Sequence, residues 1–140
     1  IIDGDTVIVI RDGKEETVRL DAIDCPEDGQ PWGENAMYGL IKLIGGCDVQ
    51  LEIHGIDRYG RTIATVYARD RENPSRIINV NEKMVGRGHA WVMYRYWDHL
   101  PGKRKSHLIR LERSAQKRQA GLWRTENPVP PWRWRKRNPA

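Results

Sequence analysis

Several features that mark common protein classes are scarce or absent in this 140-residue sequence. No apolar run approaches the roughly 20 residues that a membrane-spanning helix needs, so we expect no membrane span and no membrane partner. Two cysteines, Cys25 and Cys47, are too few for a disulfide scaffold, and their spacing matches no zinc motif. One disulfide or two buried thiols would both fit. Serine occurs only at positions 75, 106 and 114, and no signature of a serine hydrolase is visible.

The length and composition are those of one globular domain. Hydrophobic residues make up 39% of the chain and charged residues 31%, an ordinary balance for a domain with a single core. No internal repeat is visible. The sequence starts at Ile1, without Met, inside a predicted strand, so we expect that a leader or a first strand has been removed.

The net charge of +5 is distributed unevenly along the chain. Residues 1–70 carry 7 Lys or Arg against 14 Asp or Glu, whereas residues 71–140 carry 17 against 5. An acidic half beside a strongly basic half fits a cation site next to a surface that attracts a polyanion. Solvated helix faces and a soluble tail would explain much of the same charge, so the charge alone does not decide between these interpretations.

Hydrophobic periodicity and turn residues predict short strands and three helices. Asp12 and Gly13 lie between two apolar runs and indicate a hairpin turn, so Asp12 is interpreted as a turn residue and not as a ligand. We expect an asparagine cap on the short second helix and a basic face on the third. The predicted strands cover 6–10, 16–23, 48–53, 62–67 and 90–96, and the helices cover 32–44, 79–86 and 107–119.

This order of elements argues against a parallel sheet built from strand–helix–strand units and indicates an α+β domain. Five short strands with helices packed on them suit a five-stranded OB-fold barrel with three packed α-helices. We expect this domain to cover residues 1–123, followed by a Pro-, Trp- and Arg-rich tail over residues 124–140.

Three clusters of residues could support chemistry. The first is Asp3-Gly4-Asp5-Thr6 at the entry to a strand. The second is the segment 19–27, with Arg19 on a strand and the carboxylates Asp24 and Glu27 where the chain leaves it. The third is the predicted turn 57–61, Asp-Arg-Tyr-Gly-Arg, which carries two arginines.

The residue types in these clusters suit phosphodiester hydrolysis. Carboxylate oxygens are the ligands that hard cations prefer, and guanidinium groups match phosphate geometry. A glutamate can take a proton from an attacking water. Each cluster also has a structural explanation: the first and third can be simple turns, and Arg19 can form a cross-strand ion pair with Asp21.

In combination and in order, these motifs resemble the staphylococcal nuclease family. Asp-Gly-Asp-Thr at 3–6, Arg-Leu-x-x-Ile-Asp-x-Pro-Glu at 19–27 and Asp-Arg-Tyr-Gly-Arg at 57–61 all match. The resemblance continues through residues 80–90 and ends near Gly121-Leu122-Trp123, so it covers nearly the whole chain. It implies an OB-fold nuclease that hydrolyses DNA and RNA with Ca²⁺ and with little sugar specificity, leaving 3′-phosphates. Mg²⁺ or Mn²⁺ could replace Ca²⁺.

The resemblance also implies roles for individual residues. Asp5 and Asp24 match the metal-ligating carboxylates, and Asp3 is an acidic neighbour. Cys25 stands where the founding member has a threonine that binds the metal through its backbone carbonyl, a ligand that survives the change of side chain. The remaining matches are Glu27 as general base, Arg19 and Arg61 as the phosphate-binding pair, and Arg58, Tyr59, Tyr94 and Tyr96 as substrate-binding residues.

The aromatic residues divide into packing and binding candidates. We expect Trp91, Trp97 and Trp123 in the core or at its edge. Tyr94 and Tyr96 lie two apart on a predicted strand and would share one face, on which bases could stack. The tail segment 132–137 could bind single-stranded nucleic acid or fold back onto the barrel, and we favour packing for its first tryptophan.

The predicted function is therefore a monomeric nuclease acting on DNA and RNA that is single-stranded or locally opened. The resemblance also predicts a secreted or periplasmic location. Two alternatives are a non-catalytic OB-fold module that only binds nucleic acid and a protein-interaction domain that uses the basic tail. Degenerate copies within the family would be expected to lose the arginines, the glutamate or the acidic pair, and this sequence keeps them all.

Overall fold

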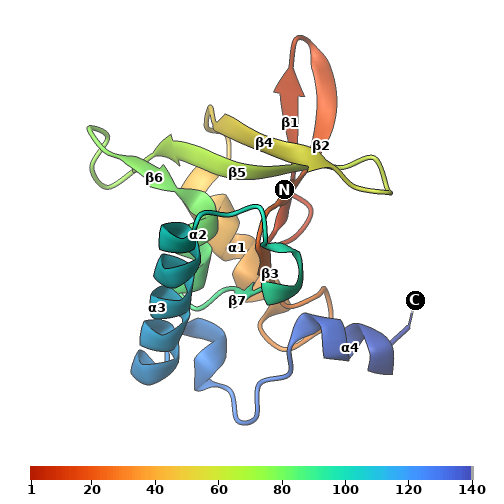
Figure 1. Ribbon diagram of the computed structural model, residues 1–140, viewed down its shortest axis with the longest axis vertical. Helices are drawn as coiled ribbons and strands as arrows, with labels where there is room; N and C mark the ends of the chain where they lie inside the picture. The colour runs from red at the N-terminus through yellow and green to blue at the C-terminus, as the bar shows by residue number, and fades with distance from the viewer. Residues whose placement is uncertain (140) are drawn as a thin grey trace.

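The computed structural model describes residues 1–139 and has the predicted α+β architecture (Figure 1). The strands are β1 (Thr6–Arg11), β2 (Lys14–Leu20), β3 (Ile23–Asp24), β4 (Gln50–Ile56), β5 (Thr62–Arg69), β6 (Ile77–Asn79) and β7 (Trp91–Val92). The helices are α1 (Gly33–Ile44), α2 (Val80–Gly86), α3 (Gly102–Arg118) and α4 (Pro131–Arg137), with two 3₁₀ turns, η1 (Tyr94–Tyr96) and η2 (Gly121–Arg124). None of the helices within residues 1–139 is long and apolar enough to cross a membrane.

Five strands form one sheet in the order β1-β2-β5-β4, with β6 paired to the far end of β5. The pair β2–β5 is parallel and places Arg19 opposite Ile63, whereas the other pairs are antiparallel. In the described part of the chain, the edge strands β1 and β4 do not pair with each other, so the sheet does not close into a barrel. A groove of about 980 Å³ lies between β1 and the segment 44–51. The predicted five-stranded sheet is present, but β6 takes the place expected for residues 90–96.

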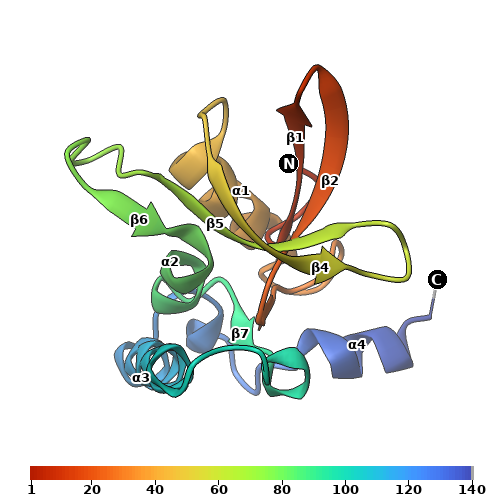
Figure 2. The same cartoon turned by 45° about the horizontal axis from the view of Figure 1, so that its top comes forward.

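The β1–β2 hairpin turns where the sequence predicts it. Asp12 and Gly13 both have positive φ, 53° and 77°, as a two-residue hairpin turn with matching twist requires. The hairpin extends away from the helices (Figure 2). Asp12 is therefore a turn residue, as predicted, and lies at the exposed tip of the hairpin.

Helix α1 packs against the sheet through the apolar stripe that the sequence indicates. Ala36, Leu40 and Leu43 are all buried. The helix ends at Gly45, whose N–H donates to the carbonyl of Ile41. Its position constrains the end of the second chemical cluster, because the loop 25–32, which carries Glu27, runs directly into it.

The two central helices differ in how well the sequence predicts their ends. Asn79 caps α2 by accepting a hydrogen bond from the Glu82 N–H at 3.0 Å, as expected. Helix α3 begins at Gly102 and not at residue 107, because the N–H groups of Arg104 and Lys105 bond to the Pro101 carbonyl. Its first turn is polar, so apolar periodicity gives no sign of it.

The predicted strand over residues 90–96 is wrong beyond its first half. Only Trp91 and Val92 form β7, which pairs with β3, and Tyr94–Tyr96 form the turn η1. The Met93 N–H still donates to the carbonyl of Ala22, the next residue in register, whereas the Val92 N–H faces away from β3 and donates to the buried side chain of Glu112 at 2.7 Å. Tyr94 and Tyr96 therefore do not share the face of a strand.

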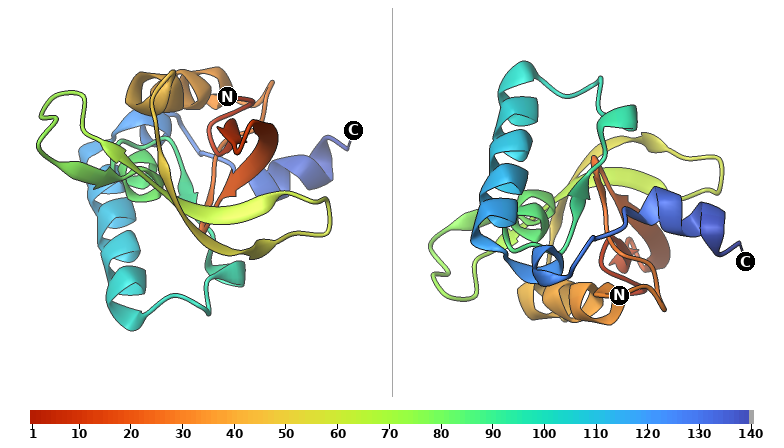
Figure 3. Two further views of the ribbon diagram at one scale, coloured as in Figure 1. Left: turned by 90° about the horizontal axis from the view of Figure 1, so that it is seen from above. Right: turned by 90° about the horizontal axis from the view of Figure 1, so that it is seen from below.

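The tail contains a fourth helix, α4, that the sequence does not predict. Figures 1 and 3 show α4 at the opposite end of the molecule from α3, beside the loop that follows β3. Pro131 is fully buried, and the Gln30 side chain donates to the Val129 carbonyl at 2.6 Å. The ring of Trp132 lies edge-on to Trp91 at 5.8 Å, so the packing expected for this tryptophan is confirmed.

Candidate active site

The first acidic cluster is built where the chain enters β1. Asp5 is buried, and its carboxylate accepts hydrogen bonds from the N–H of Cys25 at 2.7 Å and from the Thr6 hydroxyl at 3.1 Å. Asp3 accepts from the Asp5 N–H at 3.0 Å. Gly4 allows this close packing, because a Cβ there would lie 2.9 Å from Ala36 and from Cys25. The bond from Cys25 brings the loop after β3 up to the acidic strand entry.

The second cluster follows directly after the short strand β3. Asp24 is almost fully buried, with 1% of its side chain exposed. Cys25 is also buried, and both it and Cys47 are free thiols, so the chain has no disulfide between them. In the hydrogen bonds of residues 1–139, no donor reaches the Cys25 carbonyl oxygen.

Arg19 joins the two acidic groups. Its guanidinium Nη2 lies 3.5 Å from Asp5 Oδ2 and 3.4 Å from Asp24 Oδ1, while Nη1 donates to the Leu20 carbonyl at 2.6 Å. Only 14% of the Arg19 side chain is exposed. The alternative ion pair with Asp21 is wrong, because Asp21 contacts histidines instead. Arg19 is thus held in one place with its charge directed at both carboxylates.

Charge in this cluster is not balanced by Arg19 alone. Burial, together with the negative charge of Asp5, raises the pKa of Asp3 to about 7. Burial would also raise the pKa of Asp5, but Arg19 and the hydrogen bonds to its carboxylate hold that pKa below its usual range. Burial raises the pKa of Asp24, and hydrogen bonds from Arg135 offset only part of the rise. Asp5 is therefore the most firmly ionised carboxylate of the three.

Glu27 lies on the loop between β3 and α1, with its side chain one-third exposed. Its backbone N–H donates to the Gln30 side chain at 2.9 Å, and its carbonyl accepts from the Gln30 N–H. Helix α1 can approach only because residue 33 is glycine: a Cβ there would lie 2.0 Å from the Glu27 carbonyl oxygen. Gln30 and Gly33 thus set the position of Glu27, and neither residue was among the predicted site residues.

An arginine of the tail completes the cluster. Arg135 on α4 donates through Nη2 to Asp24 Oδ2 at 2.7 Å, through Nη1 to Asp24 Oδ1 at 3.3 Å, and through Nη1 to Glu27 Oε1. These bonds raise the pKa of Arg135 further above its usual value, although burial opposes the rise. Arg135 was not among the predicted site residues. The sequence of the tail segment 132–137, which includes Arg135, left open whether it binds single-stranded nucleic acid or folds back onto the barrel.

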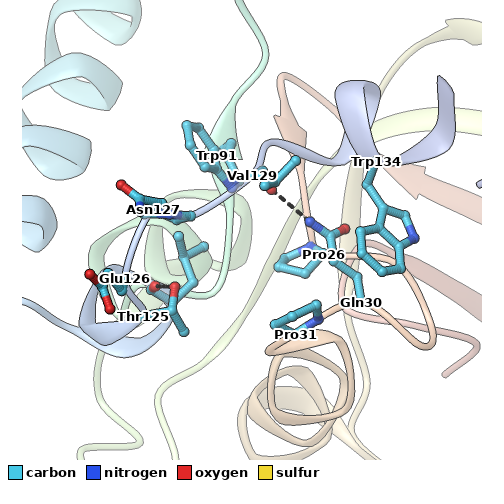
Figure 4. A pocket seen from close by; sticks show the side chains of 11 residues that line it. Pro26, Gln30, Pro31, Trp91, Thr125, Glu126, Asn127, Val129 and Trp134 are labelled. Carbon is cyan, nitrogen blue, oxygen red and sulfur yellow. Dashed lines mark hydrogen bonds between the residues drawn. The ribbon is translucent and has the colours of Figure 1, made fainter. Parts of the chain in front are cut away.

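A small pocket separates the tail from the loop that carries Glu27. Figure 4 shows Pro26, Gln30 and Pro31 on one side and the tail residues Val129 and Trp134 on another, with the Gln30–Val129 hydrogen bond between them. The pocket volume is about 120 Å³. Trp134, for which the sequence did not decide between packing and nucleic-acid binding, lines this pocket.

The third cluster lies on the turn between β4 and β5. Asp57 accepts from the Arg61 N–H and from the Tyr59 N–H, each at 2.9 Å, and its Oδ2 lies 2.7 Å from Arg61 Nε. Arg58 donates to the Tyr59 hydroxyl at 2.7 Å and stacks on its ring. Among residues 1–139 no hydrogen bond or ion pair joins Arg61 to the cluster around Arg19. Ile63 lies opposite Arg19 on the neighbouring strand, and Arg61 comes two residues before Ile63. Two residues span about 7 Å along a strand.

The predicted substrate tyrosines have different environments. Tyr94 donates to Glu112 at 2.8 Å and its ring lies edge-on to Trp97. Burial and this hydrogen bond raise the pKa of Tyr94 to about 12. Tyr96 is 64% exposed. Glu112, buried on α3, is a further residue that the sequence did not indicate.

Comparison with known proteins identifies the family. The family model described as "Staphylococcal nuclease homologue" matches residues 17–125. The chain belongs to the staphylococcal nuclease family. Among its relatives, a protein named micrococcal nuclease from Shigella flexneri is 37% identical over 139 residues, covering 97% of this chain and 77% of the relative. A protein from Escherichia coli O157:H7 named as an uncharacterized endonuclease is 36% identical over 137 residues, covering 98% and 82%.

A plant relative shows the same domain within a longer protein. A probable staphylococcal-like nuclease from Oryza sativa subsp. japonica is 32% identical over 119 residues, which cover 85% of this chain and 29% of the relative. Membership of the staphylococcal nuclease family agrees with the predicted OB-fold, whose curved sheet is seen here. The predicted relationship is therefore confirmed.

The family implies a metal ion, and the acidic cluster of this staphylococcal nuclease homologue fits one. Asp5, Asp24 and the Cys25 carbonyl offer only oxygen atoms, the donor set that Ca²⁺, Mg²⁺ and Mn²⁺ prefer. Burial, together with the negative charge of Asp5, raises the pKa of Asp3 to about 7. A divalent cation beside these carboxylates would favour their ionised forms.

Proposed function

We propose that this protein is a Ca²⁺-dependent nuclease that hydrolyses DNA and RNA, single-stranded or locally opened, and leaves 3′-phosphates. One observation carries the proposal: the guanidinium of Arg19 is fixed between the buried carboxylates Asp5 and Asp24, with Glu27 on the adjoining loop. Family membership and the names of the relatives support the same reaction class. Mg²⁺ or Mn²⁺ are the alternative cations with the same preference for oxygen.

We assign each residue a role from its chemistry and from the family resemblance. Arg19 and Arg61 bind the phosphate oxygens and stabilise the charge that builds up as the bond breaks. Glu27, on a loop fixed by Gln30, accepts a proton from the attacking water. Asp5, Asp24 and the Cys25 carbonyl would hold the cation, which supplies Lewis-acid polarisation of a phosphoryl oxygen when bound.

The aromatic and basic surfaces suit an extended substrate. Tyr59 and Tyr96 are exposed, and arginine side chains lie over both rings. Exposed aromatic rings beside cationic groups bind unpaired bases and phosphates without reading sequence. We assign Arg58, Tyr59, Tyr94 and Tyr96 to substrate binding on this basis. We further propose that the enzyme acts as a monomer and in a secreted or periplasmic setting, where Ca²⁺ is plentiful.

The test is digestion of single- and double-stranded DNA and RNA with Ca²⁺ and with excess chelator. We expect cleavage of all four substrates with Ca²⁺, none with chelator, and products that carry 3′-phosphates. Glu27→Gln should lower turnover by about 100-fold or more with the fold intact. Asp28→Asn is the matched control, because Asp28 is the adjacent acidic residue, is exposed, and should leave turnover unchanged.

Two outcomes would contradict this proposal. Cleavage that persists in chelator would exclude the metal-dependent reaction. Nucleic-acid binding without cleavage at any cation concentration would favour the alternative, a non-catalytic OB-fold module that binds nucleic acid.

A further inference from the structure

A second group of potential metal ligands lies outside the acidic cluster. Asp21 follows β2, His54 lies on β4, and His99 lies between η1 and α3. One ligand atom from each residue lies within 4.8 Å of the others. The Asp21 side chain is 4% exposed, that of His54 is 17% exposed and that of His99 is 37% exposed. The group is therefore half-sheltered and open to solvent on one side.

Both imidazoles approach one carboxylate oxygen. Nε2 of His99 lies 2.6 Å from Asp21 Oδ2, and Nε2 of His54 lies 3.6 Å from the same atom. The centres of the two imidazole rings are 4.8 Å apart. Zn–N and Zn–O bonds of about 2.0–2.1 Å in a tetrahedron place ligand atoms about 3.3 Å apart. Shifts of well under 1 Å in the two imidazole-to-carboxylate distances would bring them to this spacing.

The surroundings hold the ligands in place. The Asp21 N–H donates to the Ala64 carbonyl and its own carbonyl accepts from the Asn81 side chain, each at 2.9 Å. His54 Nε2 lies 2.9 Å from the Thr65 hydroxyl, which orients the imidazole without an ion, and a bound ion would replace this hydrogen bond. Glu52 Oε1 lies 3.4 Å from His54 Nε2 and is held by Arg104. The main chain of Asp21 is thus held by two hydrogen bonds. Metal sites commonly use such hydrogen bonds around a ligand residue to keep it in position.

A simple ion pair explains only part of this arrangement. One histidine, His99, is enough to satisfy the buried carboxylate of Asp21. It leaves unexplained why a second imidazole nitrogen, from a different strand, approaches the same oxygen with Glu52 beside it. Two imidazoles and a carboxylate are the protein ligands of an open zinc site, in which water takes the fourth position.

The two sites would prefer different ions. The cluster at Asp5 and Asp24 offers oxygen only, whereas this group offers two nitrogens and one oxygen and shares none of those residues. Imidazole nitrogen binds Zn²⁺, Co²⁺ and Ni²⁺ far better than it binds Ca²⁺. Saturating Ca²⁺ should therefore leave this second group free to bind a transition metal.

We propose that Asp21, His54 and His99 form a second metal site, which binds a divalent transition-metal ion of the Zn²⁺ class with water or Glu52 as fourth ligand. The ion joins three segments that are distant in the sequence: the end of β2, strand β4 and the loop that precedes α3. It thereby attaches to the sheet the segment that follows η1, the turn that carries Tyr94 and Tyr96. Its binding stabilises the folded state by an amount that rises with the logarithm of the ion concentration once that concentration exceeds the Kd.

The experiment is titration of the full chain with Co²⁺ in saturating Ca²⁺, followed by visible absorption. We expect one Co²⁺ per chain with the intense absorption of tetrahedral coordination, displaced by Zn²⁺. His54→Gln and His99→Gln should each weaken binding at least ten-fold. His107→Gln is the matched control, because His107 is exposed, lies 3.7 Å from Glu82 and should not alter binding. Asp24→Asn should also leave the absorption unchanged.

A second measurement keeps the result independent of folding defects. Zn²⁺ should raise the Tm of the parent protein and of His107→Gln but not that of His99→Gln. His99 is a half-exposed loop residue, and circular dichroism would verify that this variant is folded. Weak octahedral absorption, Co²⁺ binding in both histidine variants as tight as in the parent protein, or loss of binding in Asp24→Asn would each overturn the proposal.

Discussion

The guanidinium of Arg135 forms hydrogen bonds with both carboxylate oxygens of Asp24, 111 residues earlier in the chain. The same side chain reaches Glu27, the proposed general base. A divalent cation bound to Asp24 would need the oxygen atoms that Arg135 occupies. Cation binding and this tail contact are therefore expected to compete.

Removing that competitor should ease cation binding. We expect Arg135→Ala to lower the Ca²⁺ concentration for half-maximal cleavage by about five-fold, the equivalent of a partly exposed ion pair worth about 1 kcal/mol. Ca²⁺ titrations of the cleavage rate would measure it. Arg137→Ala is the control, since Arg137 lies on the same helix, is exposed and makes no contact with these carboxylates. An increase in the Ca²⁺ requirement would instead mean that Arg135 supports the reaction.

Arg61 can be tested through the aspartate that orients it. Arg61→Ala should lower kcat by about 100-fold or more, the usual cost of losing one charged donor from a transition state. Asp57→Asn keeps an oxygen that can accept the backbone N–H groups but loses the ion pair with Arg61, so we expect a smaller loss of about ten-fold. Arg58→Ala should raise KM with little change in kcat. Equal effects of Arg58→Ala and Arg61→Ala on kcat would contradict these roles.

The buried imidazole of His89 should make stability depend on pH. Burial, assisted by the positive charge of Arg87, lowers the pKa of His89 from 6.5 to about 4. Between these two values the unfolded chain binds a proton that the folded chain does not, so stability falls as the pH falls from about 6.5 to 4. The loss amounts to roughly 3 kcal/mol at most.

Urea unfolding at several pH values would measure this dependence. In His89→Gln the stability should change less over this range, whereas His107→Gln should behave as the parent protein does. The Trp32 indole N–H donates to Nδ1 of His89 at 3.0 Å, and glutamine retains an acceptor for it. Identical pH profiles in parent and His89→Gln would show that His89 titrates normally.

Glu112 should be important for stability although it lies outside the acidic cluster. Its carboxylate accepts hydrogen bonds from the Val92 N–H and from Tyr94. Glu112→Ala leaves both donors without a partner, and we expect a loss of about 2 kcal/mol or more in the free energy of unfolding. Glu112→Gln keeps one acceptor and should lose less. In that variant the pKa of Tyr94 should fall from about 12 toward 10, as ultraviolet titration against Tyr94→Phe would show.

Local sequence signals predicted the parts of the fold that depend on neighbouring residues. The Asp12-Gly13 turn, the Asn79 cap and the apolar stripe of α1 are all present where expected. The contact between Val92 and Glu112 could not be predicted, because the carboxylate that accepts the Val92 N–H lies 20 residues away in the sequence. The polar first turn of α3 carries no hydrophobic period and was missed for that reason.

The candidate site likewise contains residues that short motifs predict and residues whose contacts depend on distant parts of the chain. Asp5, Arg19, Asp24 and Glu27 belong to short motifs, and the structure brings them into one cluster. Arg135 lies in a tail whose composition suggests only charge, and its contact depends on how α4 packs beside the loop after β3. Asp21, His54 and His99 come from three distant segments, so no spacing in the sequence reveals them.

The two thiols give the molecule a built-in reporter of opening. Cys47 is exposed and open to alkylation in the native state. Cys25 lies beside Asp24 and is buried, and burial together with the charge of Asp5 raises the pKa of its thiol well above the usual value. Since alkylating reagents attack thiolates, Cys25 reacts only when the loop around it leaves the sheet. The modification rate of this one sulfur atom thus records how often the acidic cluster comes apart.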